Sequence, residues 1–283
     1  MIELAAGRAR ATILPGKGAG LAGLWFDGLP ALTLAPSPRE AATTGLAMFP
    51  LAPFSNRISG GFRFRGRHHD LLPNREGEPF PIHGDAFQRP WRVTDSGTGH
   101  ATLMLEDGAF GPWRYRAELR YRLSATELET RLALTSTATA ALPYGAGFHP
   151  WFPRTPDTRL GFRAKGAWPE NARHLPDTLA PVALPEVGPG NGGSELPEGA
   201  INQGFAGWDG NARITQGPGA ASLHVATEGL GTVILYSPGR DAGFFCFEPV
   251  THPVDAHNLP GRPGLVVLAP GESMTVSMTL AAG

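Results

Sequence analysis

Apolar and polar residues alternate one by one along two neighbouring segments, residues 115–123 and 128–134. A period of two places the apolar side chains on one face of a β-strand and the polar ones on the other. The four residues between the segments, 124–127, suit a turn. The pattern therefore predicts a β-hairpin with one solvated face.

The rest of the chain also favours strands over helices. Its 38 glycines and 28 prolines recur at short intervals that long helices do not tolerate. Further strands are predicted at residues 11–14, 20–26, 61–67, 91–95, 101–106, 159–164, 222–226, 231–236, 244–248 and 273–280. So many strands, without helices long enough for βαβ crossovers, predict an all-β fold, a large antiparallel sandwich.

Residues 1–283 are expected to form a single domain without internal repeats. The Pro- and Gly-rich segment 179–199 has the composition of a linker. Because strand patterns resume after it, we interpret it as a surface loop near the functional site.

Composition narrows the class of protein. Hydrophobic residues make up 41% of the chain, which is enough for a packed core. A net charge of -1 and a pI near 6.8 provide no general attraction for nucleic acid or an anionic membrane, so neither is expected as a partner. The densest basic stretch, 57–67, alternates Arg with apolar residues, as a strand with a solvated face does.

The single cysteine, Cys246, lies among phenylalanines and is interpreted as a core residue. It excludes an internal disulfide, and the N-terminus has no signal-peptide pattern. No run of eighteen apolar residues occurs. We therefore expect a cytoplasmic location.

Two ionisable residues lie in apolar, strand-like segments about a hundred residues apart. His149 is part of Phe148-His149-Pro150-Trp151-Phe152, and Glu248 is part of Cys246-Phe247-Glu248-Pro249. An ionisable group in such a setting loses solvation on folding, so it is retained where it is paired or used. A proton donor and a proton acceptor held in this way suit reversible proton transfer.

Four short motifs follow one another along the chain: Asn56-Arg57-Ile58, Ile82-His83-Gly84, Gly147-Phe148-His149-Pro150-Trp151-Phe152 and Phe247-Glu248-Pro249. Their order and spacing resemble those of the aldose 1-epimerase (galactose mutarotase) family, in its short bacterial branch. The resemblance extends from about residue 46 to the C-terminus. It implies a galactose mutarotase-like β-supersandwich whose cleft holds a monosaccharide.

The implied reaction interconverts the α and β anomers of an aldose by opening the ring. A proton must leave the anomeric hydroxyl while another reaches the ring oxygen, and the reverse closes the ring. By resemblance, Glu248 is the base, His149 is the acid and His83 is a second histidine at the ring oxygen or an adjacent hydroxyl. This chemistry needs no metal or other cofactor.

The resemblance also implies groups that bind the sugar. Arg57 matches an arginine that fixes hydroxyls, with Asn56 beside it, and Trp151 offers a flat ring face. The chain departs from the family at Asn202, which stands where an aspartate is expected. Asp209 is near enough in sequence to compensate, although Asp-Gly is foremost a turn signal.

Each of these residues also has an ordinary structural interpretation. Glu248 and Arg57 could form salt bridges, Trp151 and His149 could belong to the core, and His83 could be a turn residue. Two polar clusters, residues 252–258 with two histidines and Asp255, and residues 68–70, match no known metal-ligand spacing and are interpreted as loops.

Two rival functions stay open. A hexose 6-phosphate mutarotase would need cations near the sugar's C6, for which the sequence offers Arg63, Arg65, Arg67 and Arg89. A non-catalytic carbohydrate-binding module is suggested by Asn202 in place of aspartate. The sequence names neither the sugar nor the oligomeric state.

Overall fold

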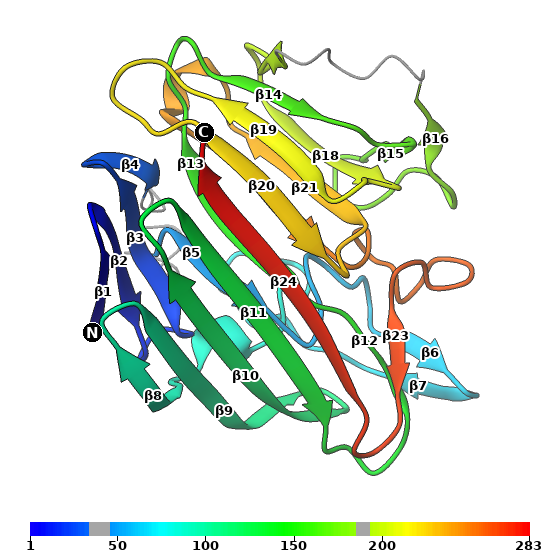
Figure 1. The fold of residues 1–283 in the computed structure, drawn as a ribbon. Helices are drawn as coiled ribbons and strands as arrows, with labels where there is room; N and C mark the ends of the chain where they lie inside the picture. Colours follow the sequence, from blue (N-terminus) through cyan, green and yellow to red (C-terminus); the bar gives the residue numbers. More distant parts are fainter. Residues whose placement is uncertain (34–45, 185–192) are drawn as a thin grey trace.

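Two large antiparallel sheets form the molecule (Figure 1). The computed structural model describes residues 1–33, 46–184 and 193–283. Every pairing between its named strands is antiparallel, and its two helical elements are single 3₁₀ turns, η2 (Ala86–Gln88) and η3 (Arg240–Ala242). The all-β supersandwich expected from the sequence is confirmed.

The 11-stranded sheet carries the chemically interesting residues. Its order is β1 (Ile2–Ala6), β2 (Ala9–Leu14), β3 (Gly20–Phe26), β5 (Met48–Leu51), β13 (Gly147–Pro153), β22 (Phe244–Val250), β21 (Thr232–Ser237), β18 (Ile201–Ala206), β15 (Gly166–Trp168) and β16 (Val182–Ala183), with β4 (Leu29–Leu32) paired to β3.

The 9-stranded sheet covers one face of the first. Its order is β17 (Ser194–Glu195), β14 (Arg159–Phe162), β19 (Asn211–Thr215), β20 (Leu223–Glu228), β24 (Ser273–Ala282), β11 (Glu127–Ser136), β10 (Trp113–Leu123), β9 (His100–Phe110) and β8 (Arg92–Gly97). Two small sheets pair β12 (Leu142–Tyr144) with β23 (Val266–Leu268), and β6 (Phe62–Phe64) with β7 (Arg67–His69).

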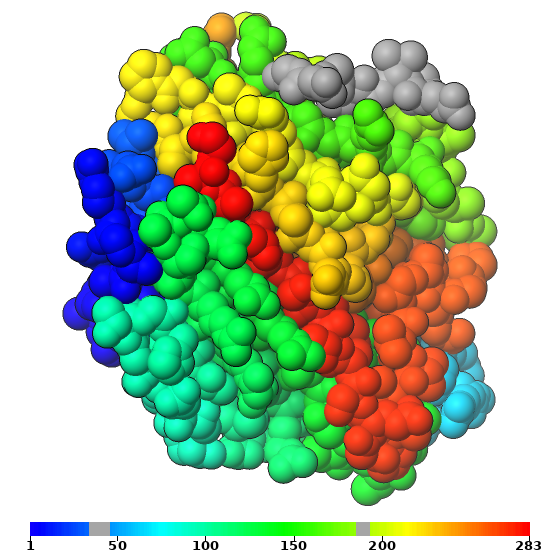
Figure 2. All heavy atoms as spheres, viewed as in Figure 1, coloured from blue at the N-terminus to red at the C-terminus, as the bar shows by residue number. Residues whose placement is uncertain are grey.

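The predicted hairpin is the pair β10 and β11. Leu119 faces Leu132 in the register, and buried side chains alternate with exposed ones along β10. Strand β24 lies between β11 and β20, where it crosses the outer face of the molecule (Figure 2). The alternation of the sequence is therefore the alternation between core and solvent.

The same alternation divides the two faces of the 11-stranded sheet. Phe148 and Phe152 of β13 join the main core between the sheets, as do Phe245 and Phe247 of β22. The intervening residues of both strands point to the opposite face, where Trp151 and Cys246 belong to a second, smaller cluster. This second face carries the polar site described below.

Two details differ from the sequence-based expectation. Residues 61–67 were expected to form one strand, but the chain turns at Arg65 and Gly66, whose φ angles are 47° and 79°, and forms the hairpin β6–β7. Several strands lie outside the predicted ranges, among them β1, β5, β18 and β19. Within the loop predicted at 179–199, residues 185–192 lie outside the described residues, and Leu179 and Val182 are exposed.

Candidate active site

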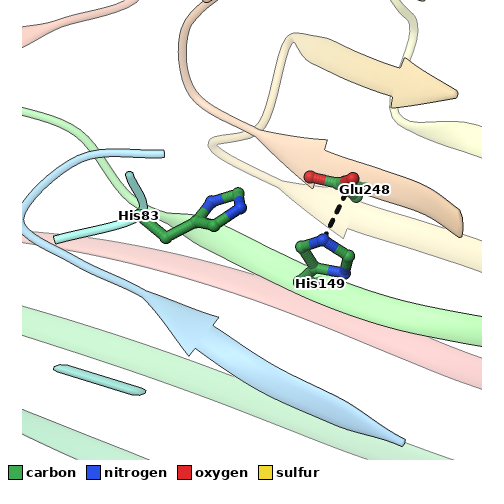
Figure 3. Close-up of side chains that lie close together, drawn as sticks. All are labelled: His83, His149 and Glu248. Atoms are coloured by element: carbon green, nitrogen blue, oxygen red, sulfur yellow. Dashed lines mark ion pairs between the residues drawn. The ribbon is translucent and has the colours of Figure 1, made fainter. Parts of the chain in front are cut away.

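His149 and Glu248 face each other on adjacent strands. Strands β13 and β22 pair Gly147 with Val250 and Trp151 with Cys246. His149 and Glu248 are midway between these pairs, so the antiparallel register places them opposite each other on one face of the sheet. Nε2 of His149 lies 3.2 Å from Oε1 of Glu248 (Figure 3).

Aromatic rings pack against the His149 imidazole and against each other. The ring of Trp151 stacks at a centroid distance of 4.1 Å, and that of Phe49 in β5 at 4.9 Å. Burial lowers the pKa of His149 to about 3, with a smaller contribution from the charge of Arg75. The Glu248 carboxylate acts in the opposite direction because an ion pair favours the imidazolium form.

His83 approaches the pair from a loop (Figure 3). It has a φ of 62°, and its Nδ1 accepts a hydrogen bond of 3.0 Å from the backbone N–H of Asn56. The backbone N–H of His83 in turn donates to the carbonyl oxygen of Asn56 at 3.0 Å. Burial holds the pKa of His83 well below its usual value. The imidazole is therefore neutral, with its proton on Nε2, and acts as a hydrogen-bond donor.

A cavity of about 600 Å³ opens over this group. It brings together seven of the eight site residues predicted from the sequence: Asn56, Arg57, His83, His149, Trp151, Asn202 and Glu248. Trp151 lines the cavity, and its stacking partner is His149. None of the described residues of the 179–199 loop lines it.

Arg57 lines the cavity but is already paired. Its Nε and Nη2 donate to the two carboxylate oxygens of Glu78, each at 3.0 Å. Both side chains are mostly buried, at 13% and 15% exposure. The fork of donors expected to bind hydroxyls is thus oriented by a carboxylate, and Nη1 is near Oδ1 of Asn56 at 3.3 Å.

Asp209 is the predicted site residue that lies outside the cavity lining. It lies in the exposed turn between β18 and β19, where its Oδ1 accepts a 3.0 Å hydrogen bond from the backbone N–H of Asn211. It is not among the residues that line the cavity. The turn signal of Asp-Gly outweighed its nearness in sequence to Asn202.

Sequence reasoning missed several cavity residues. The loop before His83 contributes Arg75, Glu76, Gly77 and Glu78, and its run of charges just ahead of a motif histidine was an available signal. Cys246, interpreted as core, is buried but also lines the cavity, two residues from Glu248 on the same face. His174 and Tyr236 had no distinguishing sequence pattern.

His83, His149 and Glu248 are also the group most able to hold a metal ion among the described residues, with ligand atoms within 4.8 Å of one another. The hydrogen bond from Asn56 argues against this role. A histidine whose Nδ1 accepts from a backbone N–H carries its proton on Nε2, so it has no lone pair for a metal there. The group fits proton transfer and hydrogen bonding better.

The polar segment 252–258 is engaged in backbone contacts. Nε2 of His252 accepts from the N–H of Ser55 at 3.1 Å, and its Nδ1 lies 2.7 Å from the carbonyl oxygen of Pro253. The Asp255 carboxylate accepts from both the N–H and the hydroxyl of Ser59. These side chains brace the loop that carries Asn56 and Arg57.

A buried carboxylate opposite an imidazole, at the floor of a polar cavity in an all-β supersandwich, is an arrangement suited to acid–base chemistry on a polar small molecule. The family comparison then specifies the class of protein. The sequence model of aldose 1-epimerase matches residues 1–281, and the chain belongs to this family.

Individual relatives agree with this assignment. The uncharacterized protein YphB of Escherichia coli K12 is 34% identical over 272 residues, which cover 93% of this chain and 92% of YphB. The crystal structure of a proposed aldose 1-epimerase from the same organism superimposes on this chain with a TM-score of 0.88 at 31% identity. The match covers 99% of this chain and 98% of the other. A galactose mutarotase-like protein from Clostridium acetobutylicum shares the fold, with a TM-score of 0.84 at 18% identity over 99% and 94% of the two chains.

No helix within the described ranges has the length and apolar character to cross a membrane.

Proposed function

We propose that this protein is an aldose 1-epimerase that interconverts the α and β anomers of a free aldose. The observation that carries the proposal is the pair of His149 and Glu248, 3.2 Å apart on the floor of a polar cavity. A reversible ring opening needs one acceptor and one donor of protons on either side of the C1–O5 unit, and this pair supplies both.

In the proposed mechanism the sugar lies in the cavity over the two side chains. Glu248 removes the proton of the anomeric hydroxyl as His149 delivers its Nε2 proton to the ring oxygen, and the C1–O5 bond breaks to give the open aldehyde. The neighbouring Glu248 carboxylate favours the imidazolium form of His149 that gives up this proton, against the burial that lowers its pKa. Rotation about C1–C2 and the reverse transfers close the ring as the other anomer.

His83 and Arg57 serve as hydrogen-bond donors in this scheme. The Nε2–H of His83 is fixed by the Asn56 hydrogen bond and would stabilise negative charge that develops on the ring oxygen. Arg57, oriented by Glu78, would bind a hydroxyl through Nη1.

The charges of the cavity disfavour the phosphorylated alternative. Its lining has two arginines, Arg57 and Arg75, against three glutamates, Glu76, Glu78 and Glu248. None of Arg63, Arg65, Arg67 and Arg89 lines the cavity, and Arg89 pairs with Asp85 and Asp107. A phosphate dianion would meet net negative charge here.

Polarimetry of freshly dissolved α-D-glucose and α-D-galactose tests the proposal. Wild type should speed the approach to the same final rotation, and Glu248→Gln should remove most of this acceleration while its melting temperature stays close to that of wild type. Glu195→Gln, at an exposed glutamate of β17, is the matched control. Undiminished activity of Glu248→Gln would refute the mechanism, and sugar binding without acceleration by wild type would favour a binding module.

A further inference from the structure

The end of the cavity away from the acid–base pair holds a second polar group. Successive register pairs align Trp151 with Cys246, Cys246 with Tyr236, and Tyr236 with Asn202 across four strands. Strands lie ~4.8 Å apart, so the backbone of Asn202 is about 10 Å from that of Cys246. A pyranose ring held by Glu248 would therefore extend toward Asn202.

Glu170 lies beyond Asn202, in line with it. Trp168 pairs with Gly204, and Glu170 and Asn202 are each two residues further along their segments. The Nδ2 of Asn202 donates to Oε1 of Glu170 at 2.8 Å. The same oxygen lies 2.7 Å from Nδ1 of His174, and both Asn202 and His174 line the cavity.

The segment that carries Glu170 and His174 is well braced. The N–H of Asp177 donates to the carbonyl oxygen of Pro169 at 2.7 Å, and the N–H of Asn171 donates to that of Leu175 at 2.9 Å. Leu175 is buried beneath it. Side chains on this loop are thus held in place relative to β18.

One oxygen of the Glu170 carboxylate therefore decides which atoms of Asn202 and His174 donate hydrogen bonds and which remain free to accept them. An ionised carboxylate only accepts hydrogen bonds, so Asn202 must present its NH₂ to Glu170 and its carbonyl oxygen away from it. By the same reasoning His174 donates from Nδ1, which leaves the lone pair of Nε2 available. At the acid–base end the Nε2–H of His83 is a donor, whereas the charge of Arg57 reaches Glu170, where it favours the ionised carboxylate.

We propose that Glu170 is a positioning residue that turns Asn202 and His174 into hydrogen-bond acceptors for hydroxyls at the far end of the sugar, and thereby sets which aldose is preferred. This inference rests on the proposed function. A hydroxyl both donates and accepts, so a cavity with donors at one end and acceptors at the other selects the orientation of the ring as well as its configuration. Discrimination is strong where a buried polar group would be left unpaired by the wrong isomer.

The test replaces Glu170 with a side chain of similar length that cannot accept. Glu170→Met should raise the KM of the preferred aldose about tenfold, the effect of one lost charge-assisted hydrogen bond, with kcat within about twofold of wild type. Glu170→Gln keeps an acceptor oxygen at the same place and should restore most of the lost affinity. Glu195→Met is the matched control on an exposed glutamate.

Binding of deoxy sugars identifies which sugar hydroxyl donates to Asn202 and His174. Among the monodeoxy forms of the preferred aldose, one should bind wild type about tenfold more weakly than the parent sugar and should lose little more in Glu170→Met. A fall in kcat at unchanged KM, an equal loss for every deoxy sugar, or a Glu170→Gln variant as impaired as Glu170→Met would each overturn the inference.

Calorimetry separates this inference from the proposed function. If wild type binds aldoses without accelerating mutarotation, the proposed function fails, and the dissociation constants of the same variants still decide the role of Glu170. If wild type is active and Glu170→Met equals it, only the role of Glu170 fails. If wild type binds no aldose, both fail.

Discussion

The two ends of the cavity are built differently. At the acid–base end, His149 packs against two aromatic rings, and Glu248 and His83 are almost fully buried. At the far end, residue Tyr236 is 37% exposed, and His174 is also exposed. The comparison suggests that reactive groups need rigid, desolvated surroundings, whereas groups that choose among sugars can lie at the rim on a braced loop.

The largest expected difference between the ends is in turnover. His149→Gln should lower kcat by a factor of about 10²–10⁴, the usual contribution of a general acid, with a small change in KM. His174→Gln should mainly raise KM. Anomerisation rates of both variants over a range of sugar concentrations check this, and a similar loss of kcat in both would remove the distinction between the ends.

Backbone substitution should also separate rigid from open parts of the cavity wall. A Cβ on Gly84, where φ is 68°, would lie 2.0 Å from the carbonyl oxygen of Ala52. Gly84→Ala should therefore lower the free energy of unfolding by more than the ~1–3 kcal/mol that a left-handed backbone conformation costs alone. It should also displace His83. Gly77 has a φ of 78°, and a Cβ added there would meet no atom within 4 Å. Gly77→Ala is therefore the control for backbone strain without a steric clash. Urea unfolding of the two variants provides the comparison.

Acid should destabilise the histidines buried behind the acid–base end. Burial lowers the pKa of His252 to about 4, whereas the unfolded chain has a value near 6.5. Between these values the unfolded state binds a proton that the folded state does not, so stability falls as pH drops from about 6.5 to 4, by about 3 kcal/mol for this residue. His83 and His257 act in the same direction.

The free energy of unfolding at pH 7 and pH 5 measures this effect. His252→Gln should flatten the dependence, while His174→Gln, on the exposed loop, should leave it unchanged. A wild-type protein equally stable at both pH values would contradict the assignment of neutral buried histidines.

The pair of Arg57 and Glu78 is part of the cavity wall. Its two hydrogen bonds of 3.0 Å in a mostly buried setting predict a coupling energy of about 1–2 kcal/mol in a double-mutant cycle of Arg57→Met and Glu78→Gln. Each single variant should raise KM because the guanidinium is no longer oriented. Additive effects would show that the pair does not act as a unit.

The smallest effect is expected outside the cavity. Asp209→Ala removes a turn hydrogen bond to Asn211 and should change stability by at most about 1 kcal/mol. Both kcat and KM should equal those of wild type. A raised KM would restore Asp209 to the sugar site and extend the far end beyond Asn202.

The sequence by itself determined the fold class and most of the acid–base end. Period-two alternation is a local property, and it correctly predicted the hairpin of β10 and β11. His149 and Glu248 were singled out because an ionisable residue among aromatic and proline neighbours is conspicuous in the sequence itself, whereas His83 came from the resemblance to the family motif. The family comparison confirms the resemblance that these motifs carried.

Only the tertiary structure decided which residues complete the cavity. The register that sets His149 opposite Glu248, and Glu170 in line with Asn202, depends on how segments far apart in the chain pair within one sheet. His174 has no local pattern that indicates a site, and Asp209 is near Asn202 in sequence but lies outside the cavity lining. Alternation fixes which face a side chain occupies, but the packing of both sheets decides its neighbours, and that is a property of the whole chain.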